Sequence, residues 1–176
     1  MQFAIAMYRA PYRRWHYNRL PGQADHRARS TLDRPSPSTA HHLEINMTTE
    51  TISEQNKKTV LAFYREAHFD GDVDGAIARY VGDTYIQHTP AAEDGVEGLR
   101  AYINFFLKNF PNAKGDIRRV IADGDIVAVH AHWTGLISPN GDVGIDIFRV
   151  TNGKLVEHWD VIAPIPGTSK NNNTMY

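Results

Sequence analysis

The stretch Gly144-Ile145-Asp146-Ile147-Phe148-Arg149-Val150 is the part of the sequence from which the fold can be worked out. Its β-branched and aromatic residues predict a strand that is largely buried. Asp146 is the exception, because burying a carboxylate is costly unless another group pairs with it or uses it. We therefore expect Asp146 to be either a paired structural group or an acid/base with a chemical role.

Similar strand patterns surround this stretch from Lys114 onward, with turn residues between them. Asp123-Gly124 and Asn152-Gly153 are typical of tight hairpins, and Pro139-Asn140-Gly141 suits a type I turn followed by a left-handed glycine. The sequence therefore predicts an antiparallel meander of four strands. The segments assigned to it are residues 117–122, 126–137, 144–150 and 154–162.

Helical patterns fill the region before these strands. A capping signature at Ser53 precedes an apolar stripe with helical spacing, which Gly71-Asp72 ends. A shorter helix is predicted over residues 73–81 and a third over residues 95–110, with a brief strand at residues 85–88 between them. Three helices followed by a meander predict an α+β domain, in which the helices cover one face of a curved antiparallel sheet.

The sequence divides into three parts. Residues 1–46 hold seven Arg, no Lys and three acidic residues and show no sustained periodicity, so we expect a disordered extension. This extension is interpreted either as the product of an upstream start, with the natural protein beginning at Met47, or as a mitochondrial transit peptide. Residues 47–165 form the predicted domain, and the polar residues 166–176 predict a loosely held tail.

Composition excludes several classes of function. The formal net charge is −1, which argues against a nucleic-acid-binding protein, and the chain has no cysteine for disulfides, thiol catalysis or zinc–thiolate sites. No apolar run approaches the roughly 18 residues of a membrane span. We expect a cytoplasmic protein that binds neither nucleic acid nor membrane.

Two turns decide which polar residues share a face with Asp146. A three-residue loop at Pro139-Asn140-Gly141 places His132 and Asp146 on the same face, whereas a two-residue loop places them on opposite faces. Proline at the first turn position favours the three-residue loop. The last hairpin has the same ambiguity, because a three-residue loop at 151–153 brings His158 to the face of Asp146 and a two-residue turn brings Trp159 instead.

Several segments, in order and with matching spacings, resemble the SnoaL-like polyketide cyclases and ketosteroid isomerases of the nuclear-transport-factor-2-like superfamily. They are Phe63-Tyr64 with Gly71-Asp72-Val73-Asp74-Gly75-Ala76, then Tyr85-Ile86-Gln87-His88-Thr89-Pro90, Asp94-Gly95-Val96-Glu97-Gly98-Leu99, and the residues from Asp146 to Val161. The resemblance implies a cone-shaped α+β barrel, with a curved sheet wrapped around three helices and a pocket between them. It also favours His158, rather than Trp159, on the pocket face.

The same resemblance implies roles for individual residues. Tyr64 stands where ketosteroid isomerases keep the tyrosine that hydrogen-bonds the oxyanion, and Asp146 stands where they keep their second oxyanion-side acid. His88 replaces their catalytic aspartate base, so ordinary steroid isomerisation is not expected. SnoaL-like cyclases pair a strand His with an Asp fourteen residues later as the acid/base centre, and His132 and Asp146 have that spacing.

These residues predict an acid/base site. Asp146, held by His132, would remove a proton from a carbon next to a carbonyl, while Tyr64 or His88 would hydrogen-bond the enolate. His158 is a further candidate. The pocket lining is expected to include the apolar or acidic residues Phe106, Phe148, Asp160 and Ile162.

The expected function is a cofactor-independent cyclase or isomerase, in the lyase or isomerase class, acting on a small apolar or polyketide-like carbonyl compound. The alternative is a module of the same fold whose pocket binds a small ligand without chemistry. His130, His132 and Asp146 would be a plausible set of zinc or iron ligands, but the resemblance implies neither metal nor cofactor.

A homodimer is also expected. On the predicted register, the face of the sheet opposite His132 carries apolar residues on two neighbouring strands, and a monomer rarely exposes so large an apolar patch. A symmetric dimer would bury the patch against its own copy. The residues assigned to this patch are Val127, Val129, Ala131, Trp133, Ile145 and Ile147.

Overall fold

The computed structural model of the protein describes residues 50–176, and the extension expected over residues 1–46 lies outside them. Within the described part, no helix is long and apolar enough to cross a membrane. The elements, in chain order, are α1 (Ile52–Tyr64), the short π-helix η1 (Arg65–Phe69), α2 (Val73–Tyr80), β1 (Val81–Gln87), α3 (Gly95–Asn109), β2 (Lys114–Asp123), β3 (Ile126–Thr134), β4 (Asp142–Thr151) and β5 (Lys154–Pro164).

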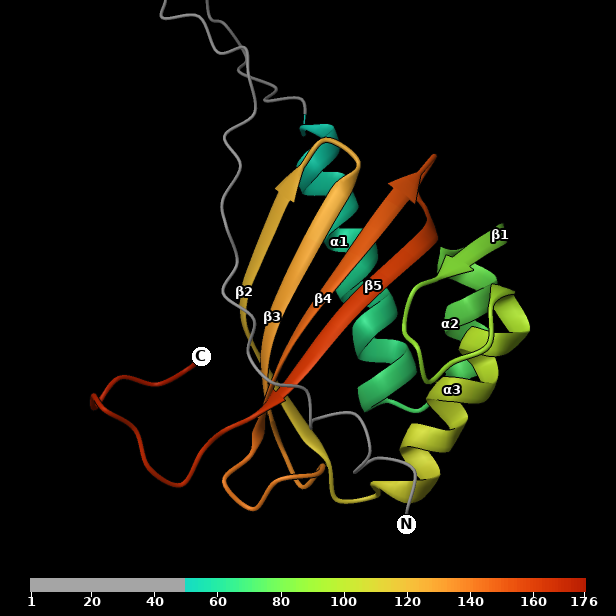
Figure 1. Ribbon diagram of the computed structural model, residues 1–176. Helices are drawn as coiled ribbons and strands as arrows, with labels where there is room; N and C mark the ends of the chain where they lie inside the picture. The colour runs from blue at the N-terminus through green and yellow to red at the C-terminus, as the bar shows by residue number, and fades with distance from the viewer. Residues whose placement is uncertain (1–49) are drawn as a thin grey trace, which may run out of the picture. The chain divides into compact units, whose positions relative to one another are not determined.

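The strands form one curved sheet in the order β1-β5-β4-β3-β2. Strands β2 to β5 are the predicted antiparallel meander, and the helices pack against one side of it (Figure 1). β1 pairs with β5 in parallel, so the sheet is mixed rather than wholly antiparallel. The predicted α+β architecture of helices and curved sheet is confirmed.

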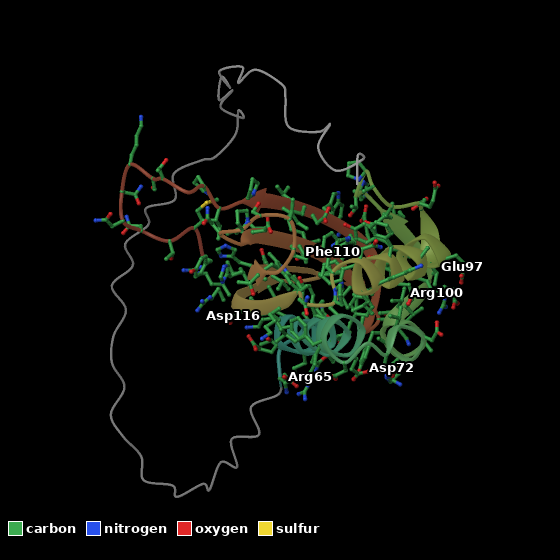
Figure 2. The ribbon with its side chains drawn as sticks, turned by 90° about the horizontal axis from the view of Figure 1, so that it is seen from below. Arg65, Asp72, Glu97, Arg100, Phe110 and Asp116 are labelled. Atoms are coloured by element: carbon green, nitrogen blue, oxygen red, sulfur yellow. The ribbon has the colours of Figure 1, made fainter. Side chains whose placement is uncertain are left out.

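Local capping sets the helix boundaries. The hydroxyl of Thr51, and not that of Ser53, accepts a hydrogen bond from the backbone N–H of Glu54 at 3.2 Å and caps α1. Asp72 caps α2 through the N–H of Gly75 at 3.1 Å. Charged residues on the helices lie at the outer surface, away from the sheet (Figure 2).

The main core lies between the helices and the sheet. Val127, Val129, Ala131 and Trp133 of β3 are all buried, with exposed fractions of 4% or less, and they pack with helix residues such as Phe63. The patch expected on the outer face is therefore wrong for β3, because these four residues contribute to the core. Ile145 and Ile147 of β4 point to the other face of the sheet, as expected, and Ile145 is 44% exposed there.

The register between β3 and β4 differs from the predicted one. Trp133 pairs with Asp142 and Val129 pairs with Asp146, so a loop longer than three residues joins the strands. The expected turn does form inside this loop, where the N–H of Gly141 donates to the carbonyl of Ser138 at 3.0 Å. His132 therefore lies on the face of the sheet opposite Asp146.

The carboxylate of Asp142 holds the long loop in place. Its Oδ2 accepts hydrogen bonds from the backbone N–H groups of Ile137 and Ser138 at 3.0 and 3.1 Å. Asp142 is only 1% exposed, so these bonds compensate the burial of Oδ2, whereas Oδ1 is buried without a hydrogen-bond partner in the described part of the chain. Asp142 is the first residue of β4, so its side chain ties the start of this strand to the loop before it.

The last hairpin combines a two-residue turn with a bulge. Thr151 pairs with Lys154, and both Asn152 and Gly153 have positive φ angles, of 51° and 72°, as a type I′ turn requires. The predicted three-residue loop is therefore wrong. Val156 is an extra residue on β5, because Val150 pairs with Leu155 while Arg149 pairs with Glu157.

The two-residue turn alone would bring Trp159 to the face of Asp146, and the extra residue in the bulge brings His158 there instead. Beyond Val156, His158 pairs with Phe148, and Asp160 pairs with Asp146. These residues consequently face the helices, as expected from the resemblance. The two-residue turn and the bulge together place them there, instead of the expected three-residue loop.

Candidate active site

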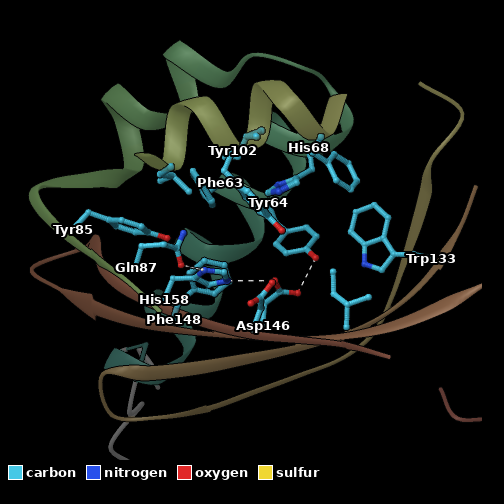
Figure 3. Close-up of a pocket in the computed structure, with 15 residues that line it drawn as sticks. Phe63, Tyr64, His68, Tyr85, Gln87, Tyr102, Trp133, Asp146, Phe148 and His158 are labelled. Atoms are coloured by element: carbon cyan, nitrogen blue, oxygen red, sulfur yellow. Dashed lines mark hydrogen bonds and ion pairs between the residues drawn. The ribbon is translucent and has the colours of Figure 1, made fainter. Parts of the chain in front are cut away.

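A small cavity lies between the helices and the sheet (Figure 3). Its volume is about 40 Å³, and the four residues expected to line it, Phe106, Phe148, Asp160 and Ile162, all do so. Most of the remaining lining is aromatic or apolar, which makes a weakly solvated site in which charges interact strongly. No Lys or Arg of the described residues lines this cavity.

Asp146 is held at both carboxylate oxygens. The hydroxyl of Tyr64 donates to Oδ2 at 2.9 Å, and Nε2 of His158 lies 3.3 Å from Oδ1 (Figure 3). The side chains of Asp146 and His158 are 16% and 8% exposed. A carboxylate has about four lone-pair positions, so these two contacts leave some able to accept a proton from a bound molecule.

The hydrogen-bond pattern around His158 fixes its tautomer. Oε1 of Gln87 accepts the backbone N–H of Thr89 at 3.2 Å, which orients the amide with its oxygen toward His158. Nδ1 of His158 lies 2.9 Å from the same oxygen and must therefore donate to it. Nε2 of the same ring lies 3.3 Å from Oδ1 of Asp146, where a proton on either atom would form a hydrogen bond to the other.

Tyr64 is a permanent hydrogen-bond donor to this pair. Burial, reinforced by the negative charge of Asp146, raises the pKa of its phenol well above the usual value. The indole of Trp133 lies beside the phenol, with the ring centroids 6.1 Å apart. The carboxylate and the phenol are therefore joined by a hydrogen bond, and the indole packs against the phenol.

His68 lies beside this phenol as a neutral ring. It stacks on Tyr64 with the ring centroids 4.8 Å apart, and burial lowers its pKa from 6.5 to about 4. The negative charge of Asp146 opposes that shift without cancelling it. At neutral pH, His68 is thus uncharged and does not compensate the negative charge of Asp146.

A second carboxyl group, that of Asp160, lines the cavity next to Asp146. Burial raises the pKa of Asp160, while a hydrogen bond from the hydroxyl of Thr89 at 2.8 Å opposes the rise. Asp160 and Asp146 are directly paired across the β4–β5 ladder. The cavity therefore has two acidic groups on its sheet side and only His158 as a basic partner among the groups that contact them.

Two expected site residues lie on the other face of the sheet. His132 stacks on Tyr176 with centroids 3.9 Å apart, and its predicted contact with Asp146 does not form because the register places the two on opposite faces. His88 stacks on Trp159 at 4.7 Å and bonds Glu157 at 2.9 Å. The assignment of these two histidines to the pocket is therefore wrong, and His158 takes the place expected of His132.

The same register separates the histidines considered as metal ligands. His130 pairs with Ile145 and lies on the face of His132, away from Asp146. Within residues 50–176, no three His, Asp or Glu side chains are grouped in a way that would hold a metal ion.

Several lining residues were not predicted from the sequence. His68 follows Tyr64 by four residues, so helical spacing alone would have placed both on one face. Tyr85 and Gln87 are two residues apart on β1, so strand alternation would have placed both on one face, opposite His88, which follows the strand. The further residues in this group are Phe63, Leu99, Tyr102, Ile103 and Trp133.

Comparison with known proteins agrees with the fold described above. The sequence profile of the SnoaL-like domain matches residues 60–158. The fold is similar to that of a candidate polyketide cyclase from Bacillus cereus, with 25% identity, a TM-score of 0.54, and coverage of 62% of this chain and 74% of the other. It is also similar to a candidate SnoaL-like polyketide cyclase from Jannaschia, with 22% identity, a TM-score of 0.56, and coverage of 66% and 91%.

A candidate polyketide cyclase from Acidithiobacillus ferrooxidans has the same fold, with 23% identity, a TM-score of 0.53, and coverage of 64% of this chain and 91% of the other. No curated protein matches the chain. The profile match covers more than half of the sequence and includes Tyr64, Asp146 and His158. The chain belongs to the SnoaL-like domain family.

Proposed function

We propose that the protein is a cofactor-independent acid/base enzyme that removes a proton from a carbon next to a carbonyl group. The observation that carries this proposal is the Asp146 carboxylate, which is bonded by Tyr64 at 2.9 Å and by His158 at 3.3 Å in an aromatic cavity. A carboxylate beside an imidazole that can exchange a proton with it is a competent general base.

The chemical step uses only groups that line the cavity. With a proton on Nε2 of His158, Asp146 is a carboxylate and takes the proton from the C–H bond of the substrate. The electron pair of that bond forms a carbon–carbon double bond to the carbonyl carbon, and the π electrons of the carbonyl move to its oxygen, which gives an enolate. His158 keeps the carboxylate oriented. The same groups return the proton to carbon at another position in an isomerisation. In an aldol closure, where the enolate carbon bonds to a second carbonyl carbon, they return it to the alkoxide oxygen that forms.

The reaction class proposed is aldol-type cyclisation or isomerisation of a carbonyl compound. Relatives described as candidate polyketide cyclases support the first of these. The cavity volume of about 40 Å³ is well below the roughly 150 Å³ of a cavity that admits benzene, so a substrate enters only by moving side chains, and a compact substrate moves them least. A polycyclic substrate would have to open the helices.

Exchange of carbon-bound hydrogen for deuterium tests this proposal directly. Ethyl acetoacetate in deuterium oxide is followed by proton NMR with the wild type, with Asp146→Asn and with Asp116→Asn. Asp116 is an exposed carboxylate on β2 that pairs with Arg118 outside the cavity (Figure 2), so it is the matched control.

We expect the wild type and Asp116→Asn to accelerate exchange equally and Asp146→Asn to lose at least about a hundredfold, the usual size of a general-base contribution. Equal rates for wild type and Asp146→Asn would disprove the role of Asp146. If the wild type gives no acceleration but still binds compact ketones, the non-catalytic binding module becomes the better function.

A further inference from the structure

Three buried polar atoms of residues that line the cavity have no hydrogen-bond partner within the described residues: Nδ1 of His68, the hydroxyl of Tyr85 and the amide nitrogen of Gln87. The last two are hydrogen-bond donors that lie together on strand β1. Tyr85 is 3% exposed, so bulk water does not reach it freely. Buried polar groups are almost always hydrogen-bonded, and an unpaired pair of donors that faces a cavity therefore indicates a ligand atom that accepts from them.

Tyr85 and Gln87 do not become paired by forming a hydrogen bond with each other. Tyr85 and Gln87 are two residues apart on β1, which places them on one face of the strand. The amide of Gln87 is fixed because its oxygen accepts from Thr89 at 3.2 Å and from Nδ1 of His158 at 2.9 Å. Rotating the amide would place its N–H groups against two other donors.

The donors and the base lie at two ends of one cavity. Gln87 contacts Nδ1 of His158, and Nε2 of the same ring contacts Asp146 at 3.3 Å, so the imidazole separates the two. Figure 3 shows Tyr85 and Gln87 on one side of His158, and Tyr64 and Asp146 on the other. Because all of these residues line the same cavity, one bound molecule can contact the donors with its oxygen and extend past the imidazole toward Asp146.

The charges in the cavity select the kind of oxygen. Asp146 and Asp160 both line it, whereas no Lys or Arg of the described residues does. A ligand carboxylate would meet two acidic groups with His158, already paired with Asp146, as their basic partner, while a carbonyl oxygen needs only neutral donors. The hydroxyl of Tyr64 is not an available donor, because it already bonds Asp146.

We propose that Tyr85 and Gln87 bind the carbonyl oxygen of a compact, uncharged substrate and hold it as charge develops there, while Asp146 takes the proton. This inference rests on the proposed function and assigns its substrate class and its oxyanion donors. When the C–H bond breaks, its electron pair passes to the oxygen that these two donors bind, and the proton passes to Asp146.

The test measures binding of two probes with the same skeleton by titration NMR of the labelled full-length protein. The uncharged probe is 3-methyl-2-butanone, and the anionic probe is isobutyrate, in which an oxygen replaces one methyl group. The variants are Tyr85→Phe, which removes the hydroxyl, and Gln87→Glu, which keeps the acceptor oxygen and replaces the donor. The matched controls are Tyr80→Phe and Gln55→Glu, which lie outside the cavity.

We expect the ketone to bind the wild type at least about tenfold more tightly than isobutyrate, and each cavity variant to weaken ketone binding roughly fivefold, as for one lost hydrogen bond. The controls should bind like the wild type. Absence of saturable ketone binding, tighter binding of isobutyrate, or unchanged binding by both cavity variants would overturn the inference. Asp146→Asn should keep ketone affinity while losing deuterium exchange, so a failure of catalysis is distinguished from a failure of this subsite.

Discussion

Tyr64 Oη lies 2.9 Å from Asp146 Oδ2, and this hydrogen bond joins helix α1 to strand β4 across the cavity. It connects residues 82 positions apart, at a point where the phenol is 2% exposed. The bond therefore both fastens the helix to the sheet and holds the carboxylate at the position where its chemistry is proposed.

Removing this hydroxyl is expected to destabilise the fold. Tyr64→Phe should lower the free energy of unfolding by about 2 kcal/mol, as for a hydrogen bond to a charged group that is left partly unpaired. Urea denaturation at neutral pH measures it. Tyr80→Phe is the control, because its hydroxyl bonds Glu66 near the surface and should cost less. Equal losses for the two variants would contradict the importance assigned to the Tyr64–Asp146 bond.

His68 should make the protein sensitive to acid. Its pKa is about 4 in the folded state against 6.5 for the free side chain, so the unfolded state binds more protons between these values and stability falls as the pH falls through that window. Between about pH 7.5 and about pH 5, this effect amounts to about 2 kcal/mol. His68→Leu should lose most of that pH dependence and His130→Leu should keep it. A parallel pH profile for both variants would show that His68 is not the sensor.

Asp160 should have the opposite effect on the pH profile. Burial raises its pKa, so the folded state holds the proton more tightly than the unfolded state, and stability is lost as the pH rises from about 3.8 through the folded pKa. Asp160→Asn retains an oxygen for the hydroxyl of Thr89 and removes the buried charge. We expect the variant to be more stable than the wild type at neutral pH and similar to it at low pH. Denaturation curves in which Asp160→Asn is less stable at neutral pH would refute this.

A smaller apolar patch than the predicted one remains on the outer face, and we expect it to mediate a homodimer. Ile145 and Val161 are paired across β4 and β5 and are 44% and 64% exposed. Light scattering at micromolar concentration should give a dimer mass, and Val161→Asp should give a monomer. Ile52→Asp, at an exposed residue of α1, is the control. A monomeric wild type would disprove the prediction.

The sequence predicts the architecture because the signals for it are local. Helical stripes, strand alternation and glycine turns each act over a few residues, and these features are found in the structure. The turn at 152–153 is where it was predicted, and the first hairpin turns at 124–125, one residue later than predicted. The parallel pairing of β1 with β5 was not predicted, because it joins segments separated by about half of the domain and leaves no local mark.

The site is predicted less completely, because it depends on register. Two features of the structure decide which residues face the cavity: the loop that Asp142 anchors, and the bulge at Val156. Each changes strand pairing by a residue or more, and a shift of one residue moves every side chain to the other face. This is why His132 was assigned to the pocket wrongly, whereas Asp146, identified by its buried carboxylate, was placed there correctly.

The measurement that tests most directly whether Asp146 and His158 act as one acid/base unit is a double-mutant cycle on the rate of deuterium exchange. The variants are Asp146→Asn, His158→Gln and the combination of both, each checked for folding by thermal denaturation. If the two residues share one proton and one task, the double variant should be no slower than the slower single variant, within about threefold. Rate losses that multiply, so that the double variant is slower by the product of the two single effects, would show that they act independently and would contradict the proposed pair.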